Sequence, residues 1–203
     1  MSNSLYSDAA LLNSLFGNAS NFGALGSAPG LYAALSSTLV YPNGTNITEP
    51  LSANGYARVA AGGGNWAAAA NVDPAWAAST PESSGYLIAD SNGFQQMIST
   101  AGTTGATAPA WNTTVGGTTA DGTAVWTNQG QEPQVIKNSS VITFPSASAT
   151  WLGGVNIAFF ALFDSITIGS GDCIVTGIIT VPAPVLSGDT ATFSIGNMVI
   201  ELT

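Results

Sequence analysis

The last third of the chain is a series of short apolar runs separated by turn-forming residues. Glycine, asparagine, aspartate and serine interrupt the runs at short intervals, and each run is too short for a typical helix. Regularly spaced short runs of this kind are typical of strands in a sandwich or a jelly-roll. The expected strands are 140–144, 155–163, 166–168, 173–181, 190–195 and 198–202. The run 155–163 is apolar almost throughout, as expected for a strand buried on both faces.

The first 60 residues add two further strands and one helix. We expect the strands at 31–35 and 55–60. A short helix over about 7–16 is predicted because four apolar residues recur at helical spacing and Gly17 follows as a stop. Such a helix could cover the open end of the β core, or it could dock onto a neighbouring subunit. The residues that would make that docking contact are Leu11, Leu12, Leu15 and Phe16.

The segment 67–134 differs in texture from the chain on either side of it. It opens with four alanines, and two β-prone runs follow at 85–88 and 94–100. An Asp-Gly pair at 121–122 precedes a further strand and predicts a hairpin. We therefore expect a small β module inserted into a loop of a β-sandwich core domain. The predicted core domain comprises 1–66 and 135–203, and the fold class is all-β.

Charged residues are scarce, and their scarcity excludes several functions. Only 6% of the residues are charged, against about 25% in an ordinary soluble domain. The chain carries a formal net charge of -9, two basic residues and no histidine. Nucleic-acid binding needs clustered lysine and arginine, so we expect no nucleic-acid partner. Triads and metal sites built on histidine are excluded, and no cofactor or metal is expected.

Hydrophobic side chains make up 45% of the residues, yet no membrane segment is expected. The most apolar run, 157–163, stops at Asp164 and is far shorter than the roughly 20 residues of a membrane helix. The lone Cys173 adjoins an apolar run and is interpreted as a packed residue. An apolar chain with so few charges is expected to bury surface in an assembly, so a homo-oligomer is predicted, with a trimer as one candidate.

The acidic residues of the insert show no catalytic spacing. Glycan cleavage needs two carboxylates about 5 to 9 Å apart, and no pattern pairs the candidates Glu82, Asp90, Asp121 and Glu132. Asp121 is already explained as a turn residue. We therefore expect no enzymatic activity and no catalytic residues. Two tryptophans of the insert, Trp111 and Trp126, are the candidates for contact with a partner or a glycan. The alternative, which we favour, is that they form the small core of the module.

Six motifs follow one another in the chain: LLNSLFG at 11–17, LYAALSST at 31–38, EPLSANGYARVA at 49–60, ITFPSASATW at 142–151, FFALFD at 159–164 and LSGDTATFSIGNMVIELT at 186–203. In content and order they resemble a family of small virion proteins of tailed phages, labelled tail-fibre or head-decoration proteins. A second resemblance, of the insert to a module of phage tail and fibre proteins, lies in AGTTGATAPAW at 101–111 and GGTTADGTAVWTNQG at 116–130. The insert itself departs from the simpler family members.

This resemblance implies a structural protein located in the virion. The first expectation is a capsid cement or decoration protein that stabilises the head shell through oligomeric contacts with the major capsid protein. The alternative is a tail fibre or tail adaptor component that contacts other tail proteins and takes part in recognition of the host surface. On the sequence alone, the capsid surface is favoured over the tail.

Overall fold

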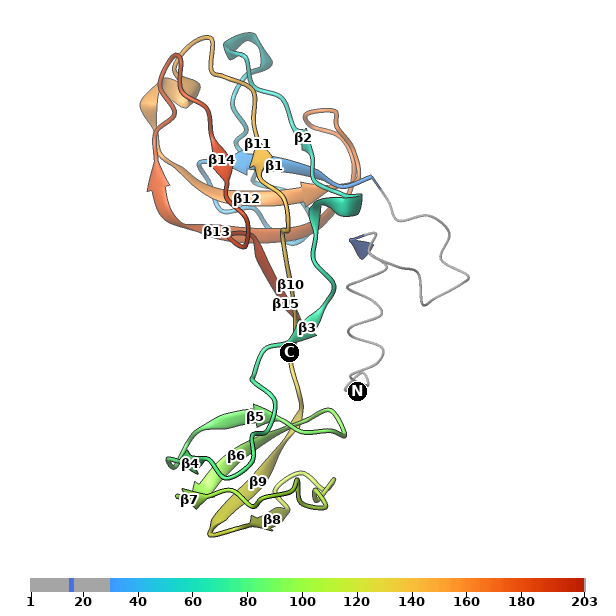
Figure 1. Cartoon of the computed structure of the whole chain (residues 1–203). Helices are drawn as coiled ribbons and strands as arrows, with labels where there is room; N and C mark the ends of the chain where they lie inside the picture. The colour runs from blue at the N-terminus through green and yellow to red at the C-terminus, as the bar shows by residue number, and fades with distance from the viewer. Residues whose placement is uncertain (1–14, 17–29, 203) are drawn as a thin grey trace. The chain divides into compact units, whose positions relative to one another are not determined.

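The computed structural model describes residues 15–16 and 30–202 (Figure 1). The described part is all-β, as predicted, and its helical elements are three short 3-10 helices. It divides into two compact units. The core unit contains the described residues among 13–68 and 137–199, and the insert unit contains 69–136 and 200–202. The sequence had placed the insert at 67–134. Most of the predicted N-terminal helix, residues 7–14, lies outside the described residues.

A four-stranded antiparallel sheet is the main element of the core unit. Its order is β13-β12-β1-β2. The apolar run predicted at 155–163 forms β12, which lies inside the sheet and is buried along most of its length. The register pairs Phe160 with Leu35 on one side and with Gly177 on the other. The strands are β1 (Tyr32–Ser36), β2 (Val59–Ala60), β12 (Ile157–Phe163) and β13 (Cys173–Ala183).

Aromatic rings join this sheet to a second layer of the core unit. That layer contains the two-stranded sheet of β11 (Ile142–Thr143) and β14 (Thr192–Phe193). The Phe160 ring of β12 contacts the Phe193 ring of β14 at 5.6 Å between centroids. Packing of one sheet face on another through large side chains is the arrangement of a β-sandwich. The 3-10 helices η1 (Ser52–Asn54), η2 (Gly63–Asn65) and η3 (Trp151–Gly154) lie in the connections.

Some predicted strands of the core unit are shorter than expected, and one is absent. The run 55–60 forms a strand only at β2, and 190–195 forms one only at β14. Residues 166–168, expected as a strand, are bends and the start of a turn, so that prediction was wrong. Backbone carbonyls on both sides of this segment accept hydrogen bonds from Arg58, which holds the segment as a loop.

The insert unit is built on its own antiparallel sheet, in the order β5-β6-β9-β8. The predicted hairpin is present: Asp121 of β8 faces Ala124 of β9 across the turn. Gly122 adopts φ +63° in this turn, and a Cβ atom there would lie 2.3 Å from the Thr103 carbonyl oxygen, so only glycine fits. The four strands are β5 (Leu87–Ala89), β6 (Phe94–Thr100), β8 (Thr118–Asp121) and β9 (Ala124–Gln131).

Short strands complete the insert unit. A two-stranded sheet pairs β4 (Pro81–Glu82) with β7 (Gly102–Thr103). A three-stranded sheet has the order β15-β10-β3, with β3 at Ala70–Asn71, β10 at Gln134–Lys137 and β15 at Val199–Leu202. Along the chain, β3 enters this unit and β10 leaves it, so both ends of the insert are held in one sheet. Closely spaced ends allow an insertion of this length at little entropic cost.

Candidate functional site

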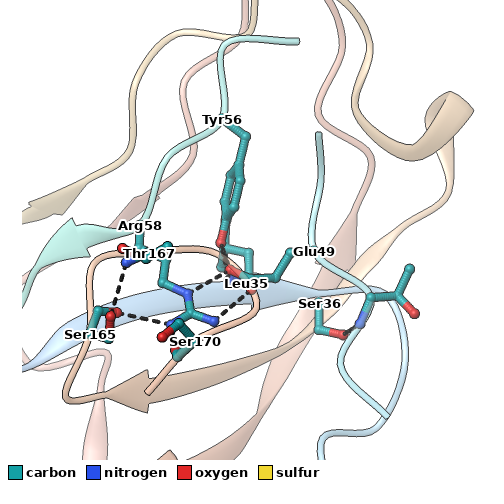
Figure 2. A network of polar contacts seen from close by, with 9 residues as sticks. Leu35, Ser36, Glu49, Tyr56, Arg58, Ser165, Thr167 and Ser170 are labelled. Atoms are coloured by element: carbon teal, nitrogen blue, oxygen red, sulfur yellow. Dashed lines mark hydrogen bonds and ion pairs between the residues drawn. The ribbon is translucent and has the colours of Figure 1, made fainter. Parts of the chain in front are cut away.

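The most elaborate polar cluster of the core unit surrounds the chain's one arginine (Figure 2). Arg58 is 2% exposed and forms an ion pair with Glu49, with Nη2 2.8 Å from Oε2 and Nε 3.0 Å from Oε1. Its Nη1 donates to the carbonyl oxygens of Ser165 and Ser170 at 2.9 and 2.8 Å. The guanidinium also lies 3.9 Å from the centroid of the Phe163 ring. Two-pronged contact with a carboxylate is the strongest geometry that arginine offers.

Tyr56 completes this cluster and shows that it is a structural one. Its hydroxyl accepts a hydrogen bond from the Leu35 backbone N–H and donates one to Glu49 Oε1, at 3.0 and 2.8 Å. Burial, reinforced by the negative charge of Glu49, raises the pKa of Tyr56 far above its usual value. The phenol therefore stays protonated and cannot act as a base. The polar atoms of the cluster form hydrogen bonds with one another and with the backbone of 165–170. The cluster therefore holds the loop 164–172 against the sheet.

The corresponding centre of the insert unit is a carboxylate bound by indoles. Asp121 is 3% exposed, and its Oδ2 accepts hydrogen bonds from Nε1 of Trp126 at 3.0 Å and of Trp76 at 2.8 Å. Its Oδ1 accepts a third bond from the backbone N–H of Gly105 at 2.7 Å. The ring of Trp111 packs edge-on against Trp126, with centroids 5.8 Å apart. The hairpin aspartate is thus also the acceptor for the buried Trp126 and the partly buried Trp76.

This geometry determines what the predicted contact residues can offer a partner. Trp111 is 8% exposed and Trp126 is 1% exposed, and both belong to the apolar core of the insert unit with Ile88 and Ile98. Neither ring presents a free face for stacking on a sugar. Sequence reasoning did not assign Trp76 to this centre or Asp121 as its acceptor. A tryptophan indole needs a hydrogen-bond acceptor when buried, and that requirement was the available signal.

The predicted docking residues near the N-terminus are described only in part. Leu11 and Leu12 lie outside the described residues. Leu15 is half-buried, and the Phe16 ring is fully buried against Trp66 with 4.3 Å between centroids. The Phe16 side chain therefore packs within its own chain. Docking of this segment onto another subunit stays a prediction.

A second carboxylate of the insert unit is buried and only partly satisfied. Glu132 is fully buried, and its Oε1 accepts a hydrogen bond from the Asp73 backbone N–H at 2.8 Å. Its Oε2 has no hydrogen-bond partner, and neither does Oε1 of the equally buried Gln96. Burial, opposed by that backbone bond and reinforced by the charges of Asp73 and Asp90, raises the pKa of Glu132. The protonated, neutral form of Glu132 therefore persists to a higher pH than that of an ordinary glutamate.

Two further side chains considered from the sequence are the acidic Asp90 and the lone Cys173. Asp90 is buried and accepts bonds from the backbone N–H groups of Asn92 and Phe94 and from Gln96 Nε2. No group of three or more acidic or cysteine side chains in the described part could hold a metal ion. Burial raises the pKa of the half-buried Cys173 thiol, which disfavours the reactive thiolate. None of the described helices is long and apolar enough to cross a membrane.

The two units therefore define an all-β protein in which the buried Glu49, Arg58 and Asp121 bond to groups of their own unit. Residues 94–201, just over half of the chain, match the model of a family described as podophage GP4 fiber I protein gp80. The chain belongs to this family, which is one of phage fibre proteins. The match begins in β6 of the insert unit and ends in β15, so it includes strands of both units. No curated protein matches the chain.

Proposed function

We propose that this protein is a component of a phage tail fibre, or of the part of the tail that carries the fibre. The observation that supports this most directly is the match of 94–201 to a phage fibre family. It favours the tail alternative over the capsid cement function that the sequence motifs had put first. The match covers most of the insert, which the motif comparison had treated as a departure from its family.

We further propose that the protein acts through shape-matched contacts and catalyses no reaction. Asp121 and Asp90 are held by donors of their own unit, and Glu49 is neutralised by Arg58. General acid–base catalysis needs a titratable group within reach of a substrate. The buried carboxylates of the described part do not offer one, which supports a structural role.

The proposed partners are further copies of this chain and other tail proteins. Nucleic acid is disfavoured as a partner because the net charge is -9 and Arg58 is buried in an ion pair. Lys137 is exposed, but a single lysine cannot displace the counterions of a nucleic acid. Within the fibre, the insert unit would be the part that contacts the host surface.

Imaging of virions with this protein labelled tests the location. The full chain is tagged in the phage genome at an exposed loop, for example beside Val115 in the insert unit, and gold-labelled antibody is imaged on intact particles. Gold confined to the tail is expected. Gold distributed over the head would contradict the tail assignment and support the cement function.

A further inference from the structure

The strand β13 has an unpaired edge. With 11 residues it is the longest strand of the described part, and it stands at the end of the order β13-β12-β1-β2. Its pairing with β12 runs from Cys173 to Ile178 with one register shift between Cys173 and Val175, and it meets β12 again at Ala183. No described strand pairs with the opposite side of β13. A row of backbone N–H and C=O groups therefore faces away from the sheet, ready to pair with another chain.

The chemistry of β13 does nothing to protect this edge. Soluble proteins commonly guard an open edge with charged side chains, proline or a cover. From Cys173 to Ser187 there is no charged residue, and Pro182 and Pro184 stand only at one end. The most exposed large apolar side chains of the described part are Val181 at 78% and Ile178 at 72%, and both belong to β13. Residues 173–181 therefore form an open edge that has no charged side chain or proline to prevent pairing with another strand.

A groove lined by both apolar and polar side chains adjoins this edge. The groove has a volume of about 740 Å³ and runs along the second half of β13; Ile178 and Val181 of β13 and Phe193 of β14 are among its lining residues. Ile157 and Phe160 of β12 also line it. Asp189 is the charged residue at the groove, and its Oδ2 already accepts the Leu186 backbone N–H at 2.9 Å. Below, the β13 surface means the edge 173–181 with this groove.

We propose that the β13 surface binds a second copy of this chain, with the two β13 strands pairing antiparallel about a twofold axis. The unpaired N–H and C=O groups of an edge strand form a regular ladder only with another extended strand. Two identical strands that run antiparallel can pair with each other about a twofold axis, because each then offers the same groups to the other. Two copies that each carry a net charge of -9 repel, so they can approach closely only through an uncharged surface. The edge 173–181 carries no charged residue and meets that condition, and contact would cover Ile178 and Val181. This inference rests on the proposed function, in which the protein acts through contacts with copies of itself, and it names the strand that makes one such contact.

Sedimentation of the purified full chain is the first test. At tens of micromolar the chain is expected to be a discrete dimer. Lysine at two edge positions, Ile178→Lys with Val181→Lys, introduces opposed like charges and is expected to weaken association by about tenfold or more. The matched control is Val141→Lys with Leu51→Lys, at positions 52% and 66% exposed and outside the four-stranded sheet. Its association is expected to equal that of the unchanged chain.

Disulfide trapping tests the pairing itself. In a Cys173→Ser background, which has no other cysteine, Thr176→Cys with Ile178→Cys is expected to form a disulfide-linked dimer on mild oxidation, because a twofold axis beside Gly177 places each new cysteine opposite the other one on the second strand. Val141→Cys in the same background is expected to stay monomeric.

Three results would overturn the inference: a monomeric full chain, equal association of the two lysine variants, or an open-ended series of aggregates. Tail labelling of virions together with a monomeric chain would refute the β13 contact and leave the proposed function standing.

Discussion

The two units of the molecule contain few charged residues, and they differ in how their buried polar centres are satisfied. In the core unit, Arg58 and Glu49 neutralise each other, and all three guanidinium nitrogens and both carboxylate oxygens form hydrogen bonds. In the insert unit, the carboxylate of Asp121 is satisfied by neutral indole and backbone donors, and Glu132 keeps one oxygen without a partner. The comparison teaches that the core relies on charge pairing, whereas the insert relies on hydrogen bonds to uncharged groups.

The largest effect is expected where charge is paired. Arg58→Met leaves Glu49 buried without its cation, and we expect a loss of about 3–5 kcal/mol in the free energy of unfolding. Adding Glu49→Gln removes the isolated charge and is expected to restore roughly half of that loss. Urea unfolding followed by circular dichroism measures both. A double variant as unstable as the single one would show that charge pairing is not what the core unit depends on.

Removal of the acceptor in the insert unit should have a somewhat smaller effect. Asp121→Ala leaves the indole N–H groups of Trp76 and Trp126 and the Gly105 N–H without an acceptor, at an expected cost of about 3 kcal/mol. Asp121→Asn keeps one acceptor oxygen and should cost about 1 kcal/mol. Tryptophan fluorescence during thermal unfolding reports on this centre directly. Equal losses for alanine and asparagine would mean that the negative charge itself is required, as in the core unit.

The smallest effect is expected at Glu132, and it depends on pH. Its pKa is raised in the folded chain, so its contribution to stability is fully present below the pKa of the unfolded chain and is lost as pH rises through the folded value. Glu132→Gln keeps an acceptor for Asp73 N–H and removes the titration. Relative to the unchanged chain, we expect the free energy of unfolding of Glu132→Gln to differ by about 1 kcal/mol or less near pH 5 and to be higher near pH 8.

Thermal unfolding at the two pH values, with Glu82→Gln as the control for loss of one negative charge, tests this expectation. If Glu132→Gln loses more stability at the higher pH than at the lower one, the ionised Glu132 is stabilised by a group other than the Asp73 N–H.

Much of the fold could be predicted from the sequence because strand and turn signals are local. The run 94–100 forms β6 with the predicted bounds, and the Asp-Gly pair forms the β8–β9 turn. Strand lengths were less predictable. The segments 55–60 and 190–195 form only two-residue strands because pairing requires a partner at matching distance, which is a property of the assembled sheets.

The polar centres were not predictable. Glu49 and Arg58 are close in sequence, but the carbonyls of Ser165 and Ser170 that complete the site follow them by more than 100 residues. Trp76 and Asp121 likewise come from distant parts of the insert. No periodicity marks contacts of that separation in a single sequence.

The sequence by itself determined that the chain is an all-β protein with almost no ionic groups, since composition and short-range pattern are properties of the residues alone. Only the tertiary structure decided which of the few charges are buried, that Trp76 and Trp126 share Asp121 as acceptor, and that β13 ends a sheet with its apolar side chains exposed. The physical reason is that burial and edge position depend on which distant segments come together.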